Sequence, residues 1–124
     1  MKKLQVERLS IFQLSAEFEK AATQHRRAFD EGDYRVSNKL SEFLDSLWGE
    51  FKRRGSEGQT AILNLMKRDD PGVRLFAAFR ALSFAPDEAE RVLQEVAAGP
   101  PSLTRLDAAM TLQEWRKGNL KPGD

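Results

Sequence analysis

His25 is the only histidine in the chain and the side chain that most directly suggests acid–base chemistry. An imidazole titrates at about pH 6.5, so it can move protons at physiological pH. Tyr34 and Asn38 follow closely enough to lie across one turn from it as hydrogen-bond partners. Counted at helical spacing from Ile11 and Phe18, however, His25 falls on an apolar stripe. That position favours a buried histidine with hydrogen-bonded nitrogens over a catalytic one.

The residue types needed for other chemistry are absent or do not cluster. The chain has no cysteine, which excludes a disulfide framework, a thiolate metal site and a cysteine nucleophile. A metal site needs several converging ligands, and the acidic pair Asp69–Asp70 is better explained as a helix cap. No Gly-x-Ser-x-Gly elbow and no glycine-rich phosphate loop occurs. We therefore predict no catalytic residue, no metal ligand and no cofactor.

Two arginines, Arg74 and Arg105, stand 31 residues apart in similar local sequences. A guanidinium fork suits carboxylates, which leaves two interpretations. The arginines either bind Asp69, Asp70 or Asp107 as internal ties, or form a row that binds an acidic partner. The internal ties are the favoured interpretation.

Basic residues close three of the predicted helices, at Lys52–Arg54, Lys67–Arg68 and Arg116–Lys117. The helix dipole stabilises cations there by roughly 0.3–1 kcal/mol each. A nucleic-acid interface would need a continuous basic stripe with aromatic platforms, whereas the net charge is only +1, from 20 basic and 19 acidic residues. Nucleic-acid binding through the basic helix ends is therefore an alternative and not the favoured function.

The composition fits one folded domain. A chain of 124 residues with 40% hydrophobic and 31% charged residues can enclose one core. We expect a single domain over residues 1–124, with an irregular arm at 1–9 and a frayed tail at 119–124. No apolar run follows the basic N-terminus, so neither a signal peptide nor a membrane span is predicted. The lack of cysteine fits a cytoplasmic protein.

Start and stop signals predict two long helices in the first half. Ser10 and Gln13 form a capping box that begins a helix ending near Gly32, and Asp33 caps the next helix, which ends at Gly55. Because so few residues separate them, the two helices should pack as an antiparallel hairpin. Their apolar stripes are Ile11, Leu14, Phe18, Ala21, Ala22, Ala28 and Phe29, then Val36, Leu40, Phe43, Leu44, Leu47, Trp48 and Phe51.

Four shorter helices are predicted in the second half. They begin at a capping box on Ser56, at Asp70–Pro71, at Pro86 and near Ser102. The helix over 71–82 is apolar almost all round, so it should be surrounded by others. The side chains expected to be buried on the last two helices are Ala89, Val92, Leu93 and Val96, then Leu103, Leu106, Ala109, Met110, Leu112 and Trp115.

An internal repeat relates these shorter helices. Shifted by 31 residues, Val73–Phe79 falls on Thr104–Met110 and matches Arg, Leu and an Ala-Ala pair. A period of one helical hairpin is typical of an α-solenoid.

The stretch Asp70–Arg74, followed by Ala77–Ala78 and Ala81–Leu82, resembles the second helix of HEAT-type repeats. With the Gly32–Arg35 turn and the ending Leu112–Arg116, the chain is also similar to a family of small bacterial proteins of unknown function. That family has a HEAT- or armadillo-like fold. The resemblance implies an all-α fold: a short α-solenoid (HEAT/ARM-like) of about six helices in three antiparallel hairpins with right-handed superhelical stacking.

Function is predicted from the repeat and from the lack of a catalytic constellation. Solenoids bind partners along extended faces, which favours a protein–protein interaction module, with an immunity- or antitoxin-like role as one form of it. The second, fourth and sixth helices should line that face. A small enzyme using His25 is an alternative. The residues predicted to contact another protein are Arg35, Asn38, Glu42, Asp45, Arg74, Arg105 and Glu114.

Two further features bear on assembly. Trp48 and Trp115 stand near helix ends, where they either pack in the core, which is favoured, or anchor an interface. A short solenoid has open apolar ends, so both a monomer and a homodimer are compatible with the sequence.

Overall fold

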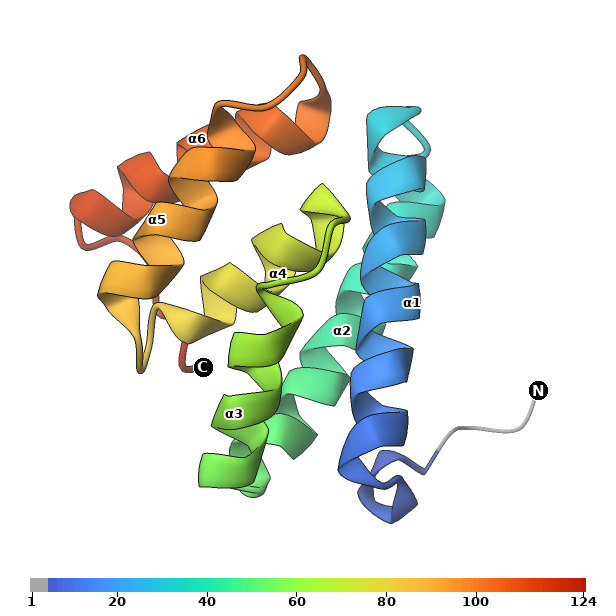
Figure 1. Cartoon of the computed structure of the whole chain (residues 1–124). Coiled ribbons are helices and arrows are strands. Elements are labelled where there is room, and N and C mark those ends of the chain that lie inside the picture. The colour runs from blue at the N-terminus through green and yellow to red at the C-terminus, as the bar shows by residue number, and fades with distance from the viewer. Residues whose placement is uncertain (1–4) are drawn as a thin grey trace.

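The computed structural model describes residues 5–124, and this part of the chain forms helices and no strand (Figure 1). The prediction of six α-helices is confirmed. Consecutive helices are joined by short turns, and a single 3-10 turn precedes them. The elements are η1 (Val6–Arg8), α1 (Ile11–Asp30), α2 (Tyr34–Arg53), α3 (Ser56–Leu65), α4 (Pro71–Ala81), α5 (Pro86–Ala97) and α6 (Leu103–Arg116).

Most of the helix starts follow the predicted capping chemistry. The capping box of Ser10 and Gln13 is present, and the Asp33 carboxylate accepts from the Val36 amide. The expected box at Ser56 is wrong, because Ser56 is already the first residue of α3. Gly55 precedes it at φ 62°, in the left-handed region that glycine tolerates best. That turn leads the chain directly from α2 into α3.

Helix α4 lies at the centre of the molecule (Figure 1). It contacts α1, α3, α5 and α6, and of its residues only Pro71 is exposed. The prediction of a surrounded helix is confirmed. Small side chains make this position possible because they let neighbouring helix axes approach. Those that are fully buried are Ala77, Ala78 and Ala81.

Helix α1 runs antiparallel to α2 beside it and also contacts α3, α4 and α6. Its approach to α4 depends on Gly72. A Cβ atom at Gly72 would lie 2.6 Å from Arg26 Cβ and 2.9 Å from the Ala22 carbonyl oxygen, closer than real Cβ contacts. The glycine of the Asp70–Arg74 stretch is therefore needed for a helix contact.

A chain of polar contacts ties α1 to the starts of two other helices. Arg26 donates from Nε to both carboxylate oxygens of Asp70, at 3.2 and 3.0 Å, while Asp70 also caps α4. Asp30 accepts from the Thr104 amide at 3.0 Å and from its hydroxyl at 2.8 Å. The last turns of α1 thus position α4 and α6.

The buried face of α6 differs from the predicted one. Leu103, Leu106 and Met110 are exposed, whereas Thr104 and Ala108 are buried. The hydrogen bonds between Asp30 and Thr104 explain the difference, because they set the rotation of α6 about its axis. Val36, expected on the apolar stripe of α2, is also exposed. The predicted buried residues of α5 are confirmed.

The two ends of the chain are more ordered than expected. In the tail, Pro122 is buried and Arg80 donates to its carbonyl oxygen at 3.2 Å, so the expected fraying is wrong. In the arm, the Arg54 guanidinium donates to the carbonyls of Val6 at 3.3 Å and Leu9 at 2.7 Å. These contacts hold η1 against the end of α2. The part of the arm over residues 1–4 lies outside the described residues.

Candidate functional site

A groove opens between α2 and α6, with α4 and the end of α1 as its floor. We call it the α2–α6 groove, and its cavity measures about 330 Å³. All three helices that the sequence places on one face, α2, α4 and α6, contribute to it. Its lining residues are His25, Phe29, Tyr34, Ser37, Asn38, Ser41, Leu75, Phe76, Phe79, Asp107 and Thr111.

Ring side chains form one continuous wall of the groove. The His25 ring lies edge-on to Phe76, with the centroids 4.6 Å apart, and stacks on Phe29 at 5.6 Å. Phe29 in turn meets Tyr34 edge-on at 6.3 Å. Such contacts are favourable beyond the area that they bury, and they keep the rings in place. The wall therefore presents a preformed aromatic surface.

His25 itself is buried, as predicted, but its hydrogen-bond partner is different. Its Nε2 atom lies 3.4 Å from the Ser41 hydroxyl, while the expected partners Tyr34 and Asn38 only line the same cavity. Burial lowers the pKa of His25 below its ordinary value, and the charge of Asp30 opposes this in part. The imidazole is therefore neutral at pH 7.

The contact between Ser41 and His25 resembles the nucleophile–base pair of serine hydrolases. Such a site also needs a group that orients the histidine and N–H donors for an oxyanion. Asp30, whose charge acts on His25, already accepts from Thr104. Ser41 lies in the middle of α2, where backbone N–H groups are used within the helix. The described residues thus supply a pair and not a complete catalytic set.

Asp107 on α6 forms part of the opposite wall. Its side chain is partly buried and meets the Thr111 hydroxyl at 3.4 Å, although that hydroxyl lies closer, at 2.8 Å, to the Asp107 carbonyl oxygen. Burial raises the pKa of Asp107, and the contact with Thr111 lowers it to a smaller extent. Within residues 5–124, no ion pair is formed by this carboxylate.

Four of the predicted partner-contacting residues lie at or beside the groove. Asn38 lines it, and helical spacing places Glu42 one turn further along the same side of α2. Asp45 continues that side and accepts from Arg80 of α4 at 2.8 Å. Glu114 lies on α6 beyond Asp107 and accepts from Asn119 at 2.7 Å.

The other three predicted contacts lie elsewhere. Arg35 is exposed at the start of α2 but outside the cavity. Arg74 and Arg105 line a separate cavity of about 320 Å³ together with Arg26. Arg74 forms an ion pair with Glu95 of α5, so the expected acceptors Asp69, Asp70 and Asp107 are wrong. The reason is that Asp70 is already bound by Arg26. Arg105 donates to the Gly99 carbonyl oxygen at 3.4 Å.

The basic helix ends are largely engaged with acidic neighbours. Arg53 and Arg54 both bind Glu50, and Arg68 lies 3.2 Å from Glu19. Arg116 and Lys117 pair with Glu90 and Glu114 in the same manner. These side chains therefore do not form a continuous basic stripe that is free to bind phosphates.

Trp48 is a core residue with one unsatisfied group. Trp48 is 4% exposed, which confirms the favoured prediction, and its indole Nε1 has no hydrogen-bond partner among the described residues. The Arg80 guanidinium lies over its ring, 5.5 Å from the centroid. Trp115 is partly buried against the core.

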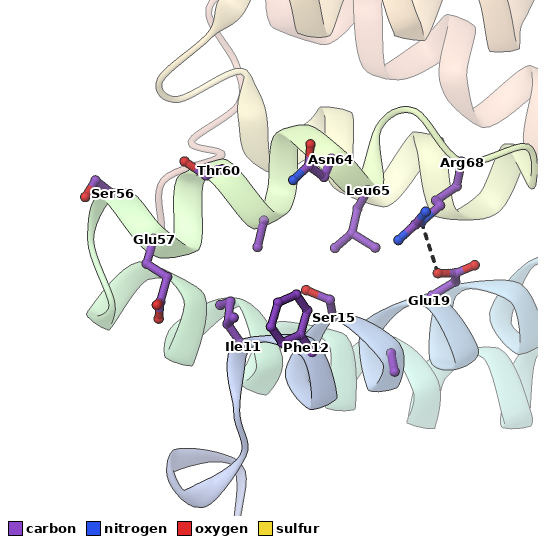
Figure 2. A pocket seen from close by; sticks show the side chains of 12 residues that line it. Ile11, Phe12, Ser15, Glu19, Ser56, Glu57, Thr60, Asn64, Leu65 and Arg68 are labelled. Atoms are coloured by element: carbon purple, nitrogen blue, oxygen red, sulfur yellow. Dashed lines mark ion pairs between the residues drawn. The ribbon is translucent and has the colours of Figure 1, made fainter.

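A second hollow, about 540 Å³ in volume, lies between α1 and α3 (Figure 2). Its floor includes Ala61 and Leu65, and Phe12 on its rim is 84% exposed. The ion pair between Glu19 and Arg68 crosses one end of it. This hollow is larger than the groove, yet its charged side chains are either paired with each other, as Glu19 and Arg68 are, or exposed, as Glu57 is.

Sequence reasoning did not identify Asp107 as a groove residue, and it did not identify the aromatic wall. Phe76 and Phe79 entered only as part of a helix that is apolar almost all round, and Asp107 was considered only as an acceptor for arginine. Their spacing carries a partial signal, since i and i+3 residues are neighbours on a helix. The contribution of α1 to the groove has no such signal in the sequence, because it depends on how that helix crosses α4.

The groups that would define some other kinds of site are not found in the described part of the chain. No cluster of three or more His, Cys, Asp or Glu residues at metal-binding distance occurs in residues 5–124. None of the described helices combines the length and apolarity that crossing a lipid bilayer requires.

Comparison with known proteins identifies relatives of the whole fold. The crystal structure of the protein RPA1889 from Rhodopseudomonas palustris CGA009 superposes with a TM-score of 0.83 at 28% sequence identity, covering 97% of this chain and 99% of that one. No curated protein matches. A family model described as a domain of unknown function (DUF2019) matches residues 12–115. Because that match spans most of the sequence, the chain belongs to the DUF2019 family.

Proposed function

We propose that this protein is a non-enzymatic interaction module that binds a segment of another protein in the α2–α6 groove. The observation that carries the proposal is the groove itself, with an aromatic wall, a polar rim and contributions from α2, α4 and α6. The proposal includes a short HEAT-like stack in which these three helices form the inner layer with a right-handed curl. Inner layers of helical repeats are extended binding surfaces.

The dimensions of the groove support a side chain or short segment as its occupant. A cavity of about 330 Å³ lies near the lower end of the range for small-molecule sites, roughly 300–1,000 Å³. Fixed aromatic rings are typical anchors of protein interfaces, because they bury much area with little loss of side-chain entropy. Tyr34 is 56% exposed at the mouth of the groove, so a partner would cover it.

One observation favours a second candidate function, a small enzyme. The 3.4 Å contact between Ser41 and His25 is within the looser range that nucleophile–base pairs show without substrate. If hydrolysis of an ester substrate is detected, His25→Gln should abolish it, while the folded state and partner capture should be retained. An activity unchanged by His25→Gln would remove this candidate.

Site-specific photo-cross-linking tests the interaction module. A photoreactive amino acid replaces Asn38 in the groove and, in the control, replaces Gln94, which is exposed on α5. In the organism that encodes the protein, we expect one distinct adduct from position 38 that position 94 does not give. Identical adduct patterns from the two positions would contradict the proposal.

Competition with purified protein makes this test specific. Unlabelled native protein should suppress the adduct from position 38, because it occupies the same partner. The variant Asn38→Arg should compete at least about tenfold less well, since its long cation obstructs the groove, a change of about 1.4 kcal/mol in binding free energy. Gln94→Arg adds the same charge on α5 and should compete like the native protein. Equal competition by both variants would place the contact outside the groove.

A further inference from the structure

Asp107 differs from Asp70 and Glu50, two other carboxylates of this protein that are withdrawn from solvent. Asp70 is bound by Arg26, and Glu50 is bound by two arginines. Arg80 lies 2.8 Å from Asp45 even though that aspartate is mostly exposed. Within the described residues, the only polar contact of the Asp107 carboxylate is the long one with the Thr111 hydroxyl. A carboxylate in this position is destabilised in its charged form unless a cation joins it.

The surroundings of Asp107 fit a cation of a particular kind. No lysine or arginine is among the groove-lining residues in the described part of the chain, so no side chain there supplies the missing charge. Across the cavity stands the aromatic wall of Phe29, Tyr34 and Phe76 with His25. Aromatic faces attract ammonium groups, and they also cover the alkyl carbons that carry such a group.

We propose that the α2–α6 groove binds a lysine side chain of the partner, with the ammonium group against Asp107 and the alkyl stem over the aromatic wall. This inference rests on the proposed function, since the partner segment supplies the lysine. It adds the chemistry that selects the partner: one ammonium group on an apolar stem. The oxygens of Asn38 and Ser41 on α2 are further acceptors for the three ammonium protons.

The charge state of His25 is compatible with this occupant. Burial lowers the pKa of His25, so the ring is uncharged at pH 7 and does not repel an ammonium group. Asp107 is thus the only charged side chain that lines the cavity among the described residues.

The first experiment uses a minimal probe on the full chain. Butylammonium chloride is titrated into isotopically labelled protein while amide and aromatic NMR signals are recorded, and butanol serves as the neutral probe of similar shape. We expect saturable shifts at His25, Asn38 and Thr111 with butylammonium, and at least tenfold weaker binding of butanol. Equal binding of the two probes, or shifts outside the groove, would overturn the inference.

Matched variants then locate the charge. Asp107→Asn keeps the shape of the side chain and should weaken butylammonium binding at least tenfold. Asp87→Asn removes an exposed charge from the first turn of α5, outside the cavity, and should change binding less than twofold. An unchanged NMR fingerprint verifies the fold of each variant. Full binding by Asp107→Asn, or equal losses in both variants, would refute a specific role for Asp107.

A peptide arm separates this inference from the proposed function. Once a partner segment is identified by cross-linking, each of its lysines is replaced in turn by norleucine, which keeps the stem and removes the charge. Loss of at least tenfold in affinity from one replacement supports the inference. Unchanged binding by every replacement would overturn the lysine anchor while leaving the interaction module intact. Butylammonium binding without any cross-linked partner would instead indicate a site for a free ammonium compound, which contradicts both the partner lysine and the interaction module.

Discussion

The two ends of α2 handle buried charge in opposite ways. At its C-terminal end, Glu50 is 6% exposed and is bound by Arg53 and Arg54, and Arg54 also holds the N-terminal arm. At its N-terminal end, α2 forms one rim of the groove, where no lysine or arginine of residues 5–124 pairs with Asp107 of α6. The pKa of Glu50 falls to about 2, chiefly through its hydrogen bond with Arg53, whereas burial raises that of Asp107.

This difference is the reason that we propose the groove, and not the C-terminal end of α2, as the binding site. The C-terminal end of α2, which we call the closed end, needs no added ion, because each buried charge there has a partner within the chain. In the groove, burial makes the charged form of the Asp107 carboxylate less stable, so an added cation would lower the free energy of the complex. The hollow between α1 and α3 is larger but resembles the closed end, since the pair of Glu19 and Arg68 is already formed. A carboxylate that forms no ion pair within the described residues is therefore a better indicator of this site than cavity volume.

The largest expected effect comes from breaking the closed end. Gly58 of α3 packs directly on α2, and a Cβ atom there would lie 1.8 Å from the Phe51 carbonyl oxygen. Backbone cannot yield as a flexible side chain does, so Gly58→Ala should lower the free energy of unfolding by about 3 kcal/mol or more. Chemical denaturation followed by circular dichroism measures this loss.

Gly49→Ala is the matched control for this substitution. Gly49 lies within α2, and nothing would stand within 4 Å of an added Cβ atom. Alanine there should leave stability unchanged or raise it by up to about 1 kcal/mol, because it is the better helix former. Similar destabilisation by both substitutions would show that the contact between α3 and α2 is not what requires glycine at position 58.

The next effect concerns the paired carboxylate. Because the folded pKa of Glu50 lies below the unfolded value of 4.5, its ionisation stabilises the fold above pH 4.5, and this contribution is lost as the pH falls toward 2. Glu50→Gln should therefore destabilise the protein by about 1–3 kcal/mol at pH 7, and by progressively less on acidification. Unfolding curves at several pH values measure the difference, and a pH-independent loss would contradict the charge-based explanation.

The opposite sign is expected for the unpaired carboxylate. The folded pKa of Asp107 lies above the unfolded value of 3.8. Deprotonation of Asp107 therefore destabilises the fold progressively as the pH rises from 3.8 to the folded pKa, and the full loss remains at higher pH. Asp107→Asn should raise stability at pH 7 by up to about 1 kcal/mol, and the gain should vanish below pH 3.8. If the substitution destabilises the protein at pH 7, the two ends of α2 do not differ as described.

The smallest effect on stability is expected at the mouth of the groove. Tyr34 is exposed, with one edge-on contact to Phe29, so Tyr34→Ala should lower the free energy of unfolding by no more than about 1 kcal/mol. The same variant should weaken partner binding in the competition assay several-fold. A large loss of stability with unchanged binding would reassign Tyr34 to the structural framework.

Much of the helical framework could be predicted because its signals are local. The capping box at Ser10, the Asp33 cap and the start of α4 at Asp70 and Pro71 each depend on residues within one turn. The central position of α4 followed from a sequence that is apolar on every side. Ser56 shows the limit, since the left-handed turn at Gly55 displaced the start of α3 relative to the capping pattern.

The candidate site could be predicted only in part. Asn38 was predicted on the side of α2 that shares a face with α4 and α6, and it lines the groove between these helices, because one helix periodicity determines that side. Arg74 and Arg105 were assigned to the same face, but they lie at another cavity, since residues equivalent in a repeat need not face the same neighbours. The apolar side of α6 was misjudged because Asp30, 74 residues before Thr104, sets the rotation of that helix.

The sequence by itself determined that this protein is built from six helices, where most of them begin and which one is surrounded. These properties follow from short-range rules of capping, helix periodicity and apolar content. Only the tertiary structure decided that the aromatic wall with His25 and the Asp107 carboxylate share one groove. Four helices must cross at fixed angles before these side chains meet. It also decided which carboxylates have a cation, since ion pairs such as Arg26 with Asp70 join residues far apart in the chain.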